Sequence, residues 1–243
     1  MPRHLCSPRH LCSIVTAFTL AAAAFGCDPP GSPPPKIQGT SVDARPGAKS
    51  PPPSNAASRP DERVLVAFGN SLTAGLGVTS SESYPSQLQE KLLLGGYRYR
   101  VINAGVSGDT TAGGLRRVDW VLKSKPEIVI LELGGNDGLR GLDLKDTRAN
   151  LEQIIQRLLA GGVKVVLAGM KLPPNYGREY TASFQSLYSD LAKQYDLPLM
   201  SFFLEGVATK AGLNQADGIH PTGPGYKIIV ENVWPTLEPL LTK

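Results

Sequence analysis

The sequence predicts an α/β fold in which a parallel β-sheet is covered by helices on both faces. From Arg63 onward, short apolar and β-branched runs alternate with longer segments whose apolar residues recur at helical spacing. The run Glu127–Leu133 (EIVILEL) is almost wholly apolar, as expected of a strand that is buried on both faces. Such alternation of strands and helices is typical of a parallel sheet with crossover helices.

Five segments carry the strand pattern, and each is bounded by glycine, proline or polar residues. In chain order they are Arg63–Phe68, Tyr97–Asn103, Glu127–Leu133, Val163–Ala168 and Leu197–Phe203. The fifth is the weakest, because Pro198 has no N–H to donate to a neighbouring strand. The pattern does not determine the strand order, and we expect the flavodoxin-like order.

Five segments are predicted to be helical. They are Ser83–Leu94, Thr110 or Thr111 to Lys123, the stretch 151–159, the stretch 184–195 and Thr222–Trp234. The clearest is 151–159, in which Leu and Ile follow the i, i+3, i+4, i+7, i+8 pattern before Gly161 ends the helix. Ser83 is expected to cap the first helix, and Pro235 is expected to end the last one.

Residues 1–27 are predicted to be a signal peptide, so the protein is expected to be exported. Residues 1–13 contain two arginines and no acidic residue. The apolar run Ile14–Phe25 that follows has the length of a signal-peptide core and is too short to span a bilayer comfortably.

Cys27 is the expected point of attachment to a membrane. The small residues before it resemble the lipobox of bacterial lipoproteins, in which the cysteine is acylated and becomes the first residue. Ala24 stands where leucine is usual, so cleavage near Ala24 by ordinary signal peptidase, leaving a free thiol, is the alternative. Because Cys6 and Cys12 fall in the leader, Cys27 would be the one cysteine of the mature chain, which favours an anchor.

The rest of the chain divides into a tether and a domain. Residues 28–60 contain ten prolines and almost no large apolar side chains, so we interpret residues 28–61 as a disordered tether. Residues 62–243 are long enough for a sizeable core. The formal charge of +4 falls to +2 without the leader, which holds two arginines, and no basic run with interleaved aromatics is present. Nucleic acid is therefore not an expected partner.

Asp217 and His220 form the most informative pair in the chain. His4 and His10 lie in the predicted leader, so His220 is the only imidazole of the mature protein. Imidazole is the side chain that most readily gives and takes a proton near neutral pH, and Asp217 is close enough to orient the ring. Asp-Gly and His-Pro are also common turn dipeptides, so this pair alone does not establish a catalytic site.

Several polar and glycine residues follow the predicted strands at one edge of the sheet. Ser71 follows the first strand, Gly105 the second and Asn136 the third, while Asp217 and His220 lie between the fifth strand and the last helix. Ligands of such sheets bind beyond the carboxyl ends of the strands. Turn residues without a shared function would be scattered over both edges.

The chemistry of these residues suits acyl transfer. A serine hydroxyl needs a base to become nucleophilic, and His220, held by Asp217, is the base available to Ser71. The N–H groups of Ser71 and Gly105 and the amide of Asn136 are candidate donors to an oxyanion. Taken singly, each of these residues is also an ordinary turn or cap residue.

Four blocks of the sequence resemble the signature blocks of the SGNH (GDSL) hydrolases. They are Gly69–Leu72, Gly105, Gly134–Asp137 and Asp217–Pro221. The resemblance covers residues 63–240 and is closest to the bacterial thioesterase I, protease I, lysophospholipase and arylesterase group. The segments that carry this closer likeness are Ser107–Thr110, Leu133–Gly141 and Leu172–Gly177.

The resemblance implies a three-layer α/β/α sandwich that works without a metal or cofactor. It implies Ser71 as nucleophile, His220 as base and Asp217 as its partner, with Ser71, Gly105 and Asn136 forming the oxyanion hole. It also implies that the loop 137–142, with Leu139 as its apolar residue, lines an acyl-binding crevice. One departure is Asn70, which stands where the family usually has aspartate. An aspartate carboxylate only accepts hydrogen bonds, whereas the asparagine amide both donates and accepts them.

We therefore predict an exported, lipid-anchored serine esterase that hydrolyses acyl esters or thioesters. Lysophospholipids or other acyl esters are the expected substrates, because acyl-CoA is scarce outside the cytoplasm. One alternative is a carbohydrate O-deacetylase, although the tether holds no carbohydrate-binding segment and aromatic residues make up 7% of the chain. The other is a non-catalytic lipid-binding lipoprotein on the same fold, for which Asn70 is the only support.

Overall fold

A computed structural model of the protein describes residues 62–243. The predicted leader, Cys27 and the predicted tether lie outside the described residues. The described part is built on one sheet of five parallel strands in the order β2-β1-β3-β4-β5. The strands are β1 (Arg63–Gly69), β2 (Tyr99–Gly105), β3 (Ile128–Glu132), β4 (Lys164–Ala168) and β5 (Leu199–Met200). This is the expected flavodoxin-like order, and the predicted α/β class is confirmed.

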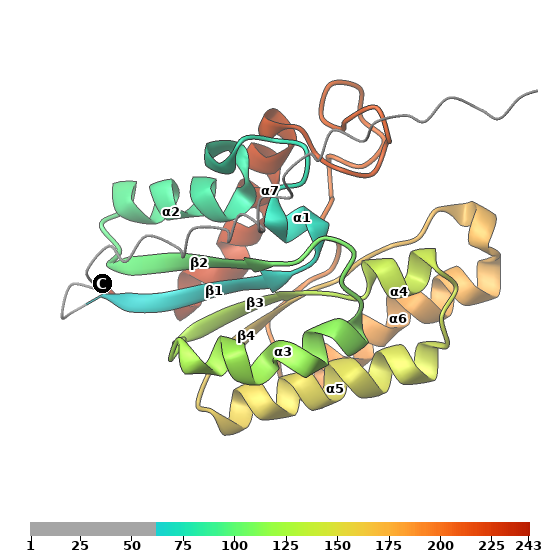
Figure 1. Cartoon of the computed structure of the whole chain (residues 1–243), viewed down its shortest axis with the longest axis horizontal. Coiled ribbons are helices and arrows are strands. Elements are labelled where there is room, and N and C mark those ends of the chain that lie inside the picture. Colours follow the sequence, from blue (N-terminus) through green and yellow to red (C-terminus); the bar gives the residue numbers. More distant parts are fainter. Residues whose placement is uncertain (1–61) are drawn as a thin grey trace, which may run out of the picture. The chain divides into compact units, whose positions relative to one another are not determined.

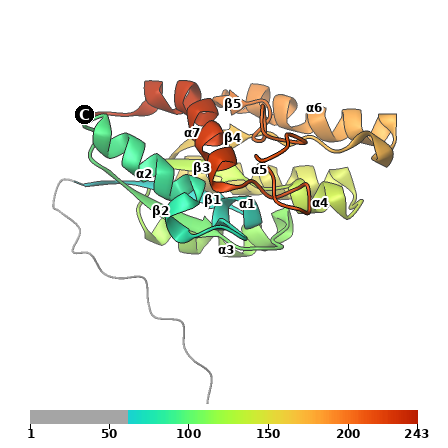
Figure 2. The same ribbon diagram turned by 90° about the horizontal axis from the view of Figure 1, so that it is seen from above.

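Helices cover both faces of the sheet and give it three layers (Figures 1 and 2). α2 and α7 lie over one face, and α3, α5 and α6 lie over the other. The α-helices are α1 (Ser71–Ala74), α2 (Tyr84–Leu94), α3 (Thr111–Lys123), α4 (Gly135–Leu139), α5 (Leu144–Ala160), α6 (Arg178–Gln194) and α7 (Gly223–Leu237), and the 3₁₀ helices are η1 (Ser80–Glu82), η2 (Pro174–Tyr176) and η3 (Glu238–Leu240). Within the described residues, no helix combines the length and apolar character that crossing a membrane requires.

The core lies between the central strands and the helices on either side. Every residue of β3 is buried, which explains why its sequence is almost continuously apolar. On α5 Leu159, the last residue of the predicted pattern, is exposed, whereas the other four, Leu151, Ile154, Ile155 and Leu158, are all fully buried. Burying a side chain of this size contributes about 1.5–3 kcal/mol each, so this face fixes α5 against the sheet.

Several element ends differ from the prediction, and proline explains two of these differences. The predicted strand 197–203 is reduced to Leu199–Met200. Pro198 explains the later start, because its carbonyl accepts from Leu167 but it has no N–H to donate to the ladder. α7 does not end before Pro235 but runs on to Leu237. Leu237 is fully buried, and that burial offsets the hydrogen bond that Pro235 cannot donate inside the helix.

The register of the sheet determines where the functional residues lie. Gly69, the last residue of β1, is paired with Gly105 of β2 on one side and with Glu132 of β3 on the other. The segments that follow these three strands therefore leave the sheet at one common edge, as the sequence predicted. The segment that leads into α7 returns to the same edge, where a hydrogen bond from the Gln215 side chain to the Leu76 carbonyl holds it.

Candidate active site

Ser71 is the first residue of α1, directly after the turn that ends β1. Asn70 caps this short helix by accepting a hydrogen bond of 2.9 Å from the Leu72 N–H. The Ser71 hydroxyl lies 2.9 Å from Nε2 of His220, and Ser71 as a residue is 8% exposed. The N–H groups of a first helical turn have no partner within the helix, and none is found for the Ser71 N–H among residues 62–243.

Asp217 fixes the opposite side of the His220 ring. Its Oδ2 lies 2.6 Å from Nδ1 of His220, while its Oδ1 accepts from the backbone N–H groups of Ile219 and His220. These bonds lower the pKa of Asp217 to about 2, the backbone bond from His220 contributing most and that from Ile219 next. Asp217 therefore remains an acceptor over the whole range in which imidazole chemistry works. The structure thus links Asp217, His220 and Ser71 in one chain of hydrogen bonds.

Gln215 holds the loop that carries His220. Its side-chain amide donates to the carbonyls of Leu76, at 2.7 Å, and of Pro221, at 2.9 Å. Its backbone N–H donates to the His220 carbonyl at 2.8 Å. One side chain therefore ties the His220 loop to the segment after Ser71. The sequence pattern did not single out Gln215, since an amide in a loop carries no distinctive signal.

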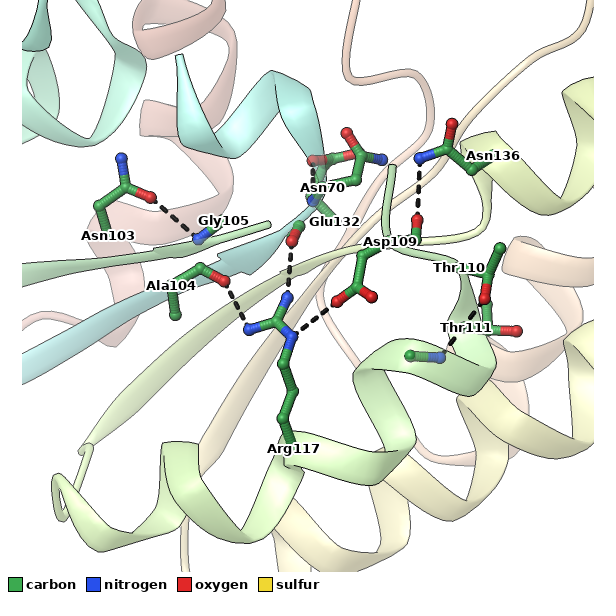
Figure 3. Close-up of polar contacts among 12 residues, drawn as sticks. Asn70, Asn103, Ala104, Gly105, Asp109, Thr110, Thr111, Arg117, Glu132 and Asn136 are labelled. Carbon is green, nitrogen blue, oxygen red and sulfur yellow. Dashed lines mark hydrogen bonds and ion pairs between the residues drawn. The ribbon is translucent and has the colours of Figure 1, made fainter. Parts of the chain in front are cut away.

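Asn136 and Asp137 lie in the first turn of α4, a short helix where the sequence predicted a loop. The Asn136 Nδ2 donates to the carbonyl of Asp109 at 2.8 Å, which uses one of its two amide hydrogens (Figure 3). The buried carboxylate of Asp137 accepts from the N–H and the hydroxyl of Thr111. Both side chains therefore fasten α4 to the segment that follows β2.

Gly105 does not present its N–H to the site in this structure. That N–H donates to Oδ1 of Asn103 at 2.9 Å (Figure 3). The next N–H, of Val106, instead donates to the Gly69 carbonyl of β1. Since successive N–H groups of a strand point to opposite sides, the Gly105 N–H faces away from β1. A side chain at position 105 would overlap the backbone of Ala74, so close packing explains the glycine.

Gly108 is the better candidate donor in this segment. It lies in the loop between β2 and α3, next to Asp109, and no acceptor for its N–H is found in the described part of the chain. Its carbonyl is held by the Arg140 guanidinium at 3.0 Å. The sequence led to Gly105 because the second strand was expected to end at Asn103, whereas β2 continues through Gly105.

A buried carboxylate lies beneath Ser71. Glu132, the last residue of β3, is fully buried and accepts from the Asn70 side-chain amide at 2.8 Å, the Asn70 N–H at 3.3 Å and the Thr73 hydroxyl at 2.8 Å. Burial raises the pKa of Glu132 to about 7, although these three donors oppose the rise. The Asn70 side-chain N–H, which an aspartate would lack, therefore has Glu132 as its acceptor. An aspartate at position 70 would instead bring a second carboxylate against Glu132.

Glu132 should make the stability of the protein depend on pH. Its pKa rises from 4.5 to about 7 on folding, so the folded protein binds this proton more tightly than the unfolded chain does. The free energy of unfolding should therefore fall as the pH rises through this window, and the loss is complete above it. The measurement is the free energy of unfolding from urea titrations at pH 5 and at pH 8. Between these two values it should fall on the order of 2–3 kcal/mol more for wild type than for Glu132→Gln. If the two proteins differ in free energy of unfolding by the same amount at pH 5 and pH 8, Glu132 is not the group that makes stability depend on pH.

Leu139, the predicted apolar residue of the crevice, is the last residue of α4 and is half-buried. Its carbonyl accepts a hydrogen bond of 2.9 Å from the Tyr176 hydroxyl. Exposed apolar side chains are also found in three of the segments that carry the candidate residues, namely Leu76, Val106 and Ile219. Among residues 62–243, no group of three or more His, Cys, Asp or Glu side chains is arranged to hold a metal ion.

Comparison with known proteins identifies the family. The sequence profile of the GDSL-like Lipase/Acylhydrolase family matches residues 67–228. Esterase TesA of Pseudomonas aeruginosa is 47% identical over 180 residues, which are 74% of this chain and 90% of that protein. Thioesterase 1/protease 1/lysophospholipase L1 of Escherichia coli K12 is 40% identical over 179 residues, 73% of this chain and 85% of that protein.

The fold agrees with this likeness. A crystal structure of TesA superposes with a TM-score of 0.72 at 47% identity, covering 74% of this chain and all of that one. The four sequence blocks, which lie far apart along the chain, meet at one edge of the flavodoxin-like sheet. The chain therefore belongs to the GDSL-like lipase/acylhydrolase family of SGNH hydrolases and is a carboxylic ester hydrolase.

Proposed function

We propose that the protein is an exported serine esterase in which Ser71, His220 and Asp217 form the catalytic triad. The observation that carries this proposal is the hydrogen-bond chain from Asp217 through both ring nitrogens of His220 to the Ser71 hydroxyl. His220 takes the hydroxyl proton at Nε2 as Ser71 Oγ attacks the carbonyl carbon of the ester or thioester. Asp217 stabilises the imidazolium that forms. The low pKa of this carboxyl suits an acceptor that stays ionised.

The two halves of the reaction use the same proton carrier. When the tetrahedral intermediate collapses, the bond to the alcohol or thiol breaks and His220 gives its proton to that leaving group. Ser71 is left as an acyl ester. A water molecule then loses a proton to His220 and attacks this ester, and the carboxylic acid is released as His220 returns the proton to Ser71.

The negative oxygen of each intermediate needs fixed donors. We assign this role to the Ser71 N–H, the Asn136 amide and the Gly108 N–H. The first and third have no acceptor among the described residues, and Asn136 has one amide hydrogen left. Gly105, the donor expected from the sequence, has its N–H bound to Asn103.

The proposed substrates are acyl esters, including lysophospholipids, with thioesters as further substrates. The relatives are named esterase and thioesterase 1/protease 1/lysophospholipase L1, and the apolar residues near the candidate site suit an acyl chain. A profile over p-nitrophenyl esters of increasing chain length, lysophospholipids and acyl thioesters tests this. We expect hydrolysis of the short esters and of lysophospholipid. Absence of turnover with every ester would overturn the proposal.

Neither alternative function is favoured by the structure. The non-catalytic alternative depended on Asn70. The Asn70 amide donates a hydrogen bond to Glu132, and the hydrogen bonds that link Ser71, His220 and Asp217 are all present beside it. No observation points to carbohydrate.

Export and attachment at Cys27 remain part of the proposal. They rest on the sequence of residues 1–27. Labelling of expressing cells with a radioactive or clickable fatty acid should mark wild type but not Cys27→Ser. An unlabelled wild type that is nevertheless exported would favour cleavage near Ala24.

A further inference from the structure

Arg117 of α3 lies beneath the carboxyl ends of β1 and β2 and contacts three separate segments (Figure 3). Its Nε donates to the Asp109 carboxylate at 2.6 Å, and its terminal nitrogens donate to the Ala104 carbonyl at 2.7 Å and the Gly69 carbonyl at 2.8 Å. The guanidinium also stacks on the ring of Phe68, 4.5 Å from its centroid. One planar group therefore joins the ends of two strands to the loop that follows.

This ion pair is not an ordinary surface pair. The side chains of Arg117 and Asp109 are only 18% and 14% exposed, whereas most exposed ion pairs contribute little to stability. Breaking a pair that is so largely removed from water leaves a charge without its partner. Gly113 leaves room for the Asp109 carboxylate, since a side chain there would overlap it. The sequence of α3 is thus adapted to hold Asp109 against Arg117.

Asp109 connects this ion pair to the proposed oxyanion donors. Its side chain is bound by Arg117, its carbonyl accepts from the Asn136 amide at 2.8 Å, and Gly108 directly precedes it. The position of Asp109 therefore sets both the orientation of the Asn136 amide and the position of the Gly108 N–H. Arg117 is the only side chain bound to the Asp109 carboxylate among the described residues.

We propose that Arg117 is a positioning residue that holds the Asn136 amide and the Gly108 N–H in place to receive the oxyanion. This inference rests on the proposed function. Arg117 does not contact Ser71 or His220, so it acts through Asp109 and through the carbonyls of Gly69 and Ala104. Lysine could not replace it fully, because a single ammonium cannot match three acceptors with the planar fork of a guanidinium.

The test is a double-mutant cycle between Arg117→Met and Asn136→Ala on a short p-nitrophenyl ester. Alone, Arg117→Met should lower kcat about 10- to 100-fold and leave KM within about threefold, because misplaced donors act on the transition state. When Asn136 is already alanine, Arg117→Met should lower kcat by a factor at least about threefold smaller than it does in wild type, because one of the donors that Arg117 positions is already absent. Arg117→Lys should recover part of the lost kcat.

Arg116→Met is the matched control, because Arg116 is the exposed neighbour on the same helix and should keep wild-type kcat. If Arg117→Met does not fold, the cycle is measured with Arg117→Lys. A kcat within twofold of wild type, or an equal loss in both backgrounds, would overturn the inference. Failure of the proposed function is distinguishable, because wild type itself would then lack esterase activity.

Discussion

Replacing Ser71 with alanine is expected to abolish ester hydrolysis. Ser71 is the proposed nucleophile, and its Oγ lies within hydrogen-bond distance of His220 Nε2. Loss of a serine nucleophile in enzymes of this type lowers kcat by roughly 10⁶-fold, which for practical assays is the background rate. The measurement is kcat/KM on a short p-nitrophenyl ester.

The fold should survive this substitution. Among residues 62–243, the one other bond of Ser71 Oγ besides the contact with His220 is that of 3.5 Å to Oδ1 of Asn70, and alanine is a good helix former at the start of α1. The thermal midpoint should therefore stay close to that of wild type. Ser80→Ala, at an exposed serine of η1, serves as the control and should retain full activity. An active Ser71→Ala protein would refute Ser71 as the nucleophile.

Replacing His220 with alanine should have the second-largest effect. Residues 28–243 contain no other histidine, so no second imidazole can take the proton from Ser71. We expect kcat to fall by at least about 10⁴-fold with little change in KM, because the loss affects the chemical step. The measurement is the full Michaelis–Menten profile of purified His220→Ala with the same ester.

Asp217→Ala provides an internal comparison for this prediction. In the proposed mechanism Asp217 acts on the reaction through His220, so its loss should lower kcat less than the loss of His220 itself. The double variant should be no worse than His220→Ala alone, because the two residues act as one unit. Two results would show that the proton takes another route. One is a double variant whose loss of kcat equals the product of the two single losses, and the other is a His220→Ala protein whose kcat is within tenfold of wild type.

The long elements of the fold were predictable from the sequence because their periodicity is set by burial. α5 and β3 show this most clearly, since four of the five apolar residues that formed the α5 pattern are buried and every residue of β3 is buried. α1 and α4 were not predicted, because helices this short contain too few residues for a periodic signal. α1 is instead fixed by its Asn70 cap, and α4 by the bonds of its Asn136 and Asp137 side chains to the segment after β2. α7 passed Pro235 because burial further along the helix outweighs a missing hydrogen bond.

The candidate site was predictable to a different degree at each residue. Ser71, Asn136, Asp217 and His220 followed from their places after strands, and the structure brings these segments to one edge of the sheet. Gly105 was chosen because the end of β2 was set two residues too early. The partnership of Asn70 with Glu132 could not be read from the sequence, because Asn70 follows β1 and Glu132 ends β3, so the two residues meet only through the register of β1 and β3.

The central claim is that Ser71 is a nucleophile activated by His220, and covalent labelling tests it most directly. A fluorophosphonate should react with wild type by forming a bond from Ser71 Oγ to phosphorus with loss of fluoride. Peptide mass spectrometry should then find the adduct on Ser71, and His220→Ala should show little or none under the same conditions. An unlabelled wild type, an adduct on another residue, or equal labelling of His220→Ala would contradict the account.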